Sequence, residues 1–189
     1  MRHISDIIVR ENILEGWLHE DGTVQFVVHT DRPVRFALRV RIPSWAVNAN
    51  RVTVNGMENE TKAVPNTWIM VTREWQDGDT VTIELPYALS FKSVDAQHPE
   101  IVALCYGPLV LCCNEMTVLV GDRDHPEKWL LPVEGEENTF RTLPGHSGFY
   151  FHICRTFKPY FTVPLMQWYY MYNKLYPDME TLDREHQGT

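Results

Sequence analysis

Strict alternation of apolar and polar residues constrains this sequence more than any other feature. Within VRFALRVRIP, residues 34–43, every second position is apolar: Val34, Phe36, Leu38, Val40 and Ile42. The positions between them include Arg35, Arg39 and Arg41. Successive side chains of a strand point to opposite faces, so this run predicts a strand with one buried and one solvated face.

Similar β-rich runs recur at short intervals along the chain. They occupy residues 23–30, 51–56, 67–75 and 80–87, with Asn55-Gly56 as a hairpin signal and Asp77-Gly78 as a turn. No convincing helical period occurs before residue 160. Short strands separated by turn signals are typical of an all-β sandwich or barrel. We predict a sandwich of jelly-roll type over residues 1–120.

The composition changes after about residue 120, where polar loops with Gly and Pro precede an aromatic-rich stretch at 149–176. Pro159 and Pro164 argue against a helix there, so we expect two strands around an irregular loop. The charged end, PDMETLDREHQGT, is expected to be a frayed tail. Residues 121–189 are therefore predicted to form a smaller C-terminal β-region.

The formal net charge of −8 argues against a nucleic-acid or anionic-membrane partner. No apolar run reaches the roughly 20 residues that a membrane span needs. Asp6, Arg10 and Glu11 interrupt the start of the sequence, so it lacks the apolar segment of a signal peptide. We expect a soluble chain without an export signal, and its cellular location is not predicted.

Three cysteines lie close together in IVALCYGPLVLCCNE, residues 101–115: Cys105, Cys112 and Cys113. Adjacent cysteines can share a metal, but a strand points them to opposite faces, and no His/Asp cluster lies at ligand spacing beside them. We interpret them as buried side chains of a sheet. The sequence predicts no metal and no cofactor.

Candidate catalytic and sugar-binding residues are few. Glu74, Asp77, Asp79 and Glu84 could supply a glycosidase-type carboxylate pair, but they fall in turns or on a solvent face. No catalytic residue is therefore assigned, and His152 is expected to be an ordinary sheet residue. Trp68 and Trp75 are assigned to the core, and Trp45, in IPSWA, is the speculative carbohydrate-binding residue.

One family shares the order of these motifs. LRVRIPSWA, then VTVNG, then the segment from Trp68 to Pro86 and VALCYGPLVL resemble the C-terminal β-sandwich region of glycoside hydrolase family 127 over about residues 23–115. These are β-L-arabinofuranosidase-like enzymes, formerly a domain of unknown function. A weaker similarity continues into FKPYFTVPLMQWYYMYNKLY, where Trp168 or Tyr169 stands in place of an expected arginine.

The resemblance implies an accessory role. In the family an N-terminal (α/α) barrel carries the acidic catalytic residue and a cysteine-rich zinc site, and no such barrel is present in this sequence. Cys112-Cys113 is followed by Asn114-Glu115 instead of the family's two prolines and asparagine, so the zinc role is not transferred.

We therefore expect a noncatalytic C-terminal β-domain that packs against and braces a catalytic barrel, supplied by a longer polypeptide or a separate chain. Such a domain, without its partner, should expose an apolar patch and self-associate through it. The aromatic C-terminal segment is expected to supply part of that patch, around Trp168, Tyr169, Tyr170 and Tyr172. The alternative is a free-standing carbohydrate-binding module with a Trp/Tyr platform, and an independent enzyme is a third hypothesis.

Overall fold

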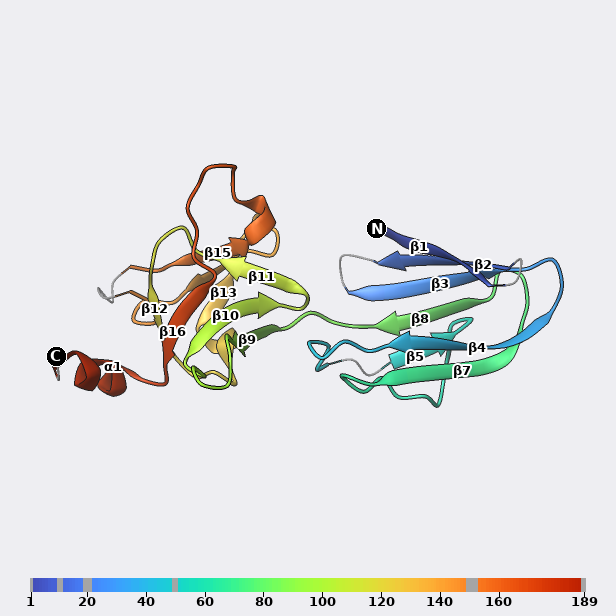
Figure 1. The fold of residues 1–189 in the computed structure, drawn as a ribbon, viewed down its shortest axis with the longest axis horizontal. Helices are drawn as coiled ribbons and strands as arrows, with labels where there is room; N and C mark the ends of the chain where they lie inside the picture. Colours follow the sequence, from blue (N-terminus) through green and yellow to red (C-terminus); the bar gives the residue numbers. More distant parts are fainter. Residues whose placement is uncertain (1, 10–11, 19–21, 49–50, 149–152, 188–189) are drawn as a thin grey trace. The chain divides into compact units, whose positions relative to one another are not determined.

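The computed structural model describes residues 2–9, 12–18, 22–48, 51–148 and 153–187. The chain divides into two compact units, Met1–Ala88 and Leu89–Thr189, and each is described here by itself. Strands dominate both units (Figure 1), and the described residues contain a single α-helix. The predicted all-β fold class is confirmed.

The described residues of the first unit form eight strands in two antiparallel sheets. These are β1 (Arg2–Val9), β2 (Asn12–Leu18), β3 (Thr23–His29), β4 (Val34–Arg41), β5 (Arg51–Val54), β6 (Met57–Glu58), β7 (Trp68–Trp75) and β8 (Thr80–Glu84). Six of them form one sheet in the order β1-β2-β3-β8-β5-β6, and β4 pairs with β7 in the other. The jelly-roll connectivity remains a prediction.

The core of the first unit joins the two sheets. Val28, Val81 and Ile83 from the larger sheet belong to the same buried cluster as Ile69 and Trp75 from β7. The Trp75 indole N–H donates to the Phe36 carbonyl at 3.1 Å, and the two rings stack with centroids 5.4 Å apart. Each fully buried aliphatic side chain stabilises the fold by about 1.5–3 kcal/mol.

Trp68 does not join this core, and its predicted burial was wrong. It is 57% exposed, whereas Trp75 on the same strand is completely buried. The reason is parity: Ile69, Val71 and Trp75 occupy odd positions and face the core, so the even position 68 must face outward.

The predicted Asn-Gly hairpin is confirmed. Asn55 and Gly56 join β5 to β6 with φ values of 51° and 76°, and Val54 pairs with Met57 across the turn. Positive φ at both central residues is what a type I′ turn requires, and Asn and Gly tolerate it best.

In the described part of the second unit, eight strands form one sheet, in which β12 pairs parallel with β16. Its strands are β9 (Leu89–Ser93), β10 (Ile101–Tyr106), β11 (Leu109–Cys112), β12 (Val118–Val120), β13 (Leu130–Pro132), β14 (Phe140–Thr142), β15 (Thr156–Pro159) and β16 (Tyr172–Tyr176). Two short 3₁₀ helices, η1 (Pro126–Lys128) and η2 (Tyr160–Thr162), lie in the connections between its strands.

Trp129 is the centre of the second core. Its indole stacks between Phe91 and His146, with centroid distances of 5.7 Å and 5.4 Å, and donates its N–H to the Asp122 carbonyl at 2.9 Å. Gly121 lies against the ring, where an added Cβ would come within 2.5 Å of it. Only glycine therefore fits at position 121 without displacing the indole.

The boundary between the units differs from the expected one near residue 120. Residue 120 ends β12, which lies in the same sheet as β10 and β16. β9 pairs with β10 through five residue pairs from Val102↔Ser93 to Tyr106↔Leu89, so residues from Leu89 onward belong to the second unit. The composition change at 120 reflects exposed loops, which say nothing about strand pairing.

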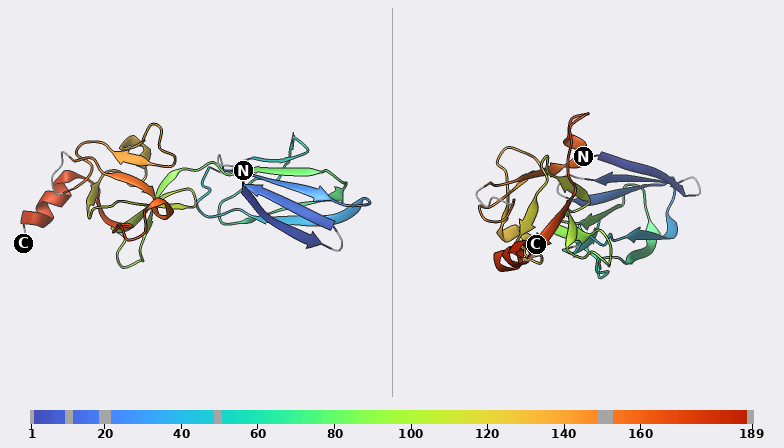
Figure 2. Two further views of the ribbon diagram at one scale, coloured as in Figure 1. Left: turned by 90° about the horizontal axis from the view of Figure 1, so that it is seen from above. Right: turned by 60° about the vertical axis from the view of Figure 1, so that its left-hand side comes forward.

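The expected frayed tail is corrected to a helix, α1 (Met179–Gln187), drawn in red in Figure 2. The Asp178 carboxylate accepts the Thr181 backbone N–H at 2.7 Å, as an N-terminal cap does. Leu182 is buried against Val118, Val120 and Tyr176. The N-terminal cap and the burial of one apolar face stabilise this helix, although the rest of its surface is charged. Among the helices of the described residues, none has the length and apolar character that a membrane crossing requires.

The loop between Pro159 and β16 follows the prediction of an irregular aromatic segment. We call residues 160–171 the aromatic loop. Trp168 lies in this loop and not in a strand, because regular pairing begins only at Tyr172, after a single bridge between Tyr170 and Cys113. The earlier expectation for His152 lies outside the described residues.

Candidate functional site

The four carboxylates considered for catalysis lie in the first unit, and most have structural partners. Asp77 accepts the Thr30 backbone N–H at 3.2 Å, and Glu84 lies 3.4 Å from the Arg51 guanidinium. Glu74 is exposed and pairs in register with Arg35. Asp77 thus serves the turn between β7 and β8, and the two glutamates have neighbours on adjacent strands.

Asp79 is the buried member of this group. Its carboxylate accepts the Asn55 side-chain amide at 2.7 Å and the Gln76 backbone N–H at 2.9 Å, and the Arg73 guanidinium lies 3.7 Å away. Burial by itself raises the pKa of Asp79, but these hydrogen bonds and the arginine charge outweigh it, so the pKa lies below its ordinary value. The network clamps the turn between β7 and β8 against the β5 hairpin.

The cysteines behave as the sequence interpretation expected. Cys112 and Cys113 are buried and Cys105 is half-buried, and all four cysteines of the chain are free thiols. Burial is the main cause that raises the pKa of Cys105, Cys112 and Cys113. A raised pKa keeps the thiol protonated near neutral pH, and the thiolate is the form that attacks and binds metal.

A polar pocket in the second unit adjoins these cysteines. Cys113 and Cys154 line it together with Glu115 and Arg155, which form an ion pair. Within the described part of the chain, no group of three or more His, Cys, Asp or Glu side chains is placed to hold a metal ion. The absence of bound zinc stays a prediction.

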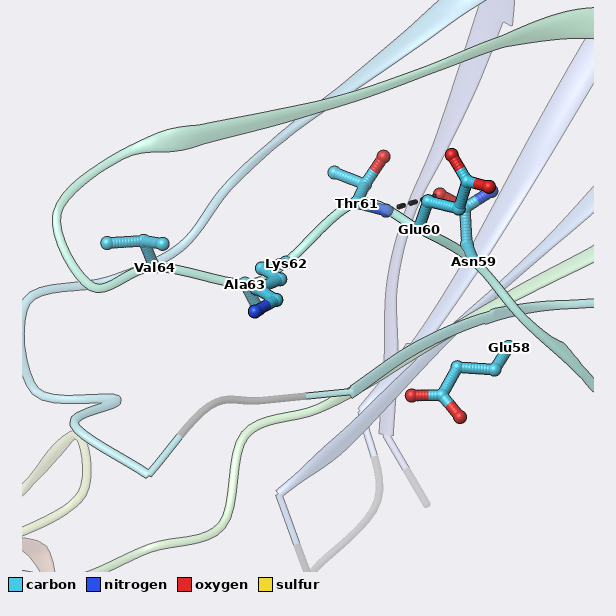
Figure 3. Close-up of a pocket in the computed structure, with 7 residues that line it drawn as sticks. All are labelled: Glu58, Asn59, Glu60, Thr61, Lys62, Ala63 and Val64. Carbon is cyan, nitrogen blue, oxygen red and sulfur yellow. Dashed lines mark hydrogen bonds between the residues drawn. The ribbon is translucent and has the colours of Figure 1, made fainter.

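An open pocket in the first unit is formed by one segment, residues 58–64 (Figure 3). The Thr61 backbone N–H donates to the Asn59 side chain at 2.9 Å, which shapes the bend. Glu58, Glu60 and Lys62 are exposed, and no aromatic ring lines the pocket. It therefore offers no stacking surface for a sugar.

Trp45, the predicted sugar-binding residue, is half-buried after the proline turn of IPSWA. Its ring packs on the first core and meets the Tyr87 ring edge-on, with centroids 5.5 Å apart and an interplanar angle of 87°. Whether Trp45 binds carbohydrate stays a prediction.

Sequence reasoning placed the arginines of β4 on a solvated face but missed the exposed tryptophan that the β4–β7 sheet brings beside them. The most exposed large side chains of this face are Trp68 and Met70, which pair in register with Arg41 and Arg39. We call Arg39, Arg41, Trp68 and Met70 the arginine–tryptophan face. The period-2 pattern of β7 contained the signal, because the parity of Ile69 and Val71 places Trp68 on the other side.

The aromatic loop is the most exposed apolar segment described in the second unit. Leu165 is 95% exposed, Met166 94% and Trp168 86%. Tyr160, Phe161 and Tyr169 are exposed as well. Clustered apolar side chains on a surface mark an interaction site more often than scattered ones do.

Comparison with known proteins finds a family match for part of the first unit. Residues 13–87 match the family model of the beta-L-arabinofuranosidase GH127 middle domain. The match covers fewer than half of the residues and ends one residue before the unit boundary. It names a middle domain, whereas the resemblance pointed to a C-terminal region extending to about residue 115. No curated protein matches the sequence.

Solved structures of similar fold extend over both units. A GH127 beta-L-arabinofuranosidase from Geobacillus stearothermophilus T6 matches with a TM-score of 0.66 at 18% identity, over 90% of this chain and 32% of its own. A GH127 beta-arabinofuranosidase gives 0.65 at 15% identity, over 90% and 33%. A protein described as a glycoside hydrolase gives 0.63 at 18%, over 87% and 32%. The chain spans about a third of the length of these proteins.

Proposed function

We propose that this chain is a noncatalytic β-part of a GH127-like glycoside hydrolase and that it packs against and braces a catalytic barrel. The match of residues 13–87 to the GH127 middle domain supports the family assignment. The observation that carries the bracing role is the aromatic loop, whose apolar side chains stand in solvent. A segment of this kind needs a partner surface, and the barrel of the same enzyme is the partner we propose.

The aromatic loop should drive self-association when the barrel is missing. Apolar surface left in water costs about 25 cal/mol per Å², so a few hundred Å² favour pairing of two copies. We expect light scattering over a concentration series to show a dimer or larger species. The double variant Leu165→Ser/Trp168→Ser should remain monomeric at concentrations where the parent chain associates.

Met57→Ser is the matched control, because Met57 is exposed but lies on β6 in the first unit. It should associate as the parent chain does. A parent chain that stays monomeric at high concentration and binds no apolar dye would contradict the bracing proposal.

The isolated chain should not hydrolyse aryl arabinofuranosides or other aryl glycosides. Asp77, Asp79 and Glu84 are engaged in structural contacts, and glycoside hydrolysis requires two carboxylates placed across the scissile bond. The measurement is release of the aryl group by repurified protein. Turnover that survives repurification and disappears when one carboxylate is changed would refute the noncatalytic assignment.

The second candidate function is a free-standing carbohydrate-binding module. Its support is the half-exposed Trp45 beside Tyr87. A Trp45→Ala variant that loses affinity for a neutral glycan, in a chain that stays monomeric, would favour this function over bracing.

A further inference from the structure

The arginine–tryptophan face gathers positive charge on a chain with a net charge of −8. Arg39 and Arg41 are both exposed on β4, two residues apart and therefore roughly 7 Å from each other. Neither forms an ion pair with any carboxylate of the described residues. The Arg41 guanidinium donates instead to the Asn66 side chain at 3.0 Å, which leaves most of its donors free.

Trp68 provides an aromatic surface beside these charges. The guanidinium carbon of Arg39 lies 5.7 Å from the centre of the Trp68 ring, within the range of a cation–π contact. This contact orients the arginine and the ring together, while 57% of Trp68 remains exposed. A ligand with an apolar face and a carboxylate could therefore use both groups at once.

The size of the face argues for a small ligand. The β4–β7 ladder has eight residue pairs, so its outer surface is roughly 27 Å long and 10 Å wide, or about 300 Å². A stable interface between separate proteins needs about 800 Å² on each partner. An oligosaccharide of a few residues fits the smaller area, and its ring faces can lie on an indole.

We propose that the arginine–tryptophan face binds an anionic oligosaccharide whose sugars carry carboxylates. Trp68 stacks on a sugar ring. Arg39 and Arg41 each donate two hydrogen bonds to a carboxylate of a neighbouring sugar. Arg35, farther along β4, pairs in register with an acid, Glu74, and not with Trp68 or Met70, so it lies outside the site. This site uses neither Trp45 nor the aromatic loop, so it stands apart from the bracing role.

The test is calorimetric titration of the whole chain with oligogalacturonate, and in parallel with the same oligomer fully methyl-esterified. Esterification keeps the ring faces and removes the charge. We expect the acid form to bind with an affinity that falls as the salt concentration rises. The ester should bind with an affinity lower by about tenfold or more. Trp68→Ala and Arg39→Gln should each lower the affinity for the acid form about tenfold.

Two matched controls accompany these variants. Arg35→Gln removes an arginine from the same strand and face, and Trp168→Ala removes an exposed tryptophan from the other unit, so both should bind as the parent chain does. Equal affinity for acid and ester, no binding of either, or unchanged binding by Trp68→Ala would overturn the proposal. Loss of self-association in Trp68→Ala, without glycan binding by the parent, would identify a protein interface and equally overturn it.

Discussion

Replacing Trp75 with alanine should lower the free energy of unfolding of the first unit by about 3–5 kcal/mol. The indole is completely buried, stacks on Phe36 and donates its N–H to a backbone carbonyl. The substitution leaves a cavity between the two sheets and removes the indole donor from a part-buried carbonyl. Native-state hydrogen exchange of the β8 amides measures this loss in the first unit alone.

Trp68→Ala on the same strand is the control for residue type. Its side chain is mostly exposed, and the cation–π contact with Arg39 is worth about 0.5–1 kcal/mol at such a site. We expect a loss of about 1 kcal/mol or less. Similar losses for the two variants would mean that β7 does not place Trp75 in the core.

Replacing Asp79 with asparagine should destabilise the first unit by about 1–3 kcal/mol at neutral pH. One of its two acceptor oxygens becomes a donor and then faces the N–H of Asn55 or of Gln76. The substitution also removes the attraction of Arg73. This effect should depend on pH, because the pKa of Asp79 is lowered in the folded protein.

A carboxyl with a lowered folded pKa stabilises the fold above its unfolded pKa of about 3.9 and loses that contribution as pH falls through the folded value. The difference between parent and Asp79→Asn should therefore be constant near neutral pH and shrink in acid. Urea unfolding at a series of pH values measures it. Asp77→Asn is the exposed control and should cost less. A difference that grows in acid would contradict the assignment.

Much of the first unit could be predicted because the alternation of apolar and polar residues along a strand shows directly which side chains are buried. β4, β5, β7 and β8 all lie within the predicted runs, and Asn55-Gly56 forms the predicted turn. The error at Trp68 came from weighing residue type above parity. Large aromatic side chains are usually buried, but in a strand the neighbouring positions decide which face a residue takes.

The second unit was harder to predict because its pairings are distant in sequence. β12 and β16 lie side by side although more than fifty residues separate them, and no local pattern encodes such a contact. The helix α1 was missed for a different reason. Its exposed surface is charged, and its stability depends on one cap and on contacts of Met179 and Leu182 with the neighbouring β16 and the distant β12.

One candidate site could be predicted from the sequence and another could not. The burial of Cys112 and Cys113 followed from strand patterning, which records burial. The arginine–tryptophan face joins β4 and β7 in a register that only the structure supplies. A sequence can show that Arg39 and Trp68 point outward, but not that one lies over the other.

The two separate cores have a consequence for the gene. Trp75 and its neighbours pack within Met1–Ala88, Trp129 and its neighbours pack within Leu89–Thr189, and the GH127 middle-domain match stops at residue 87. Recombination between codons 88 and 89 would cut through neither core nor any strand. A break in the chain at that point would leave each cluster of buried side chains with all of its own residues.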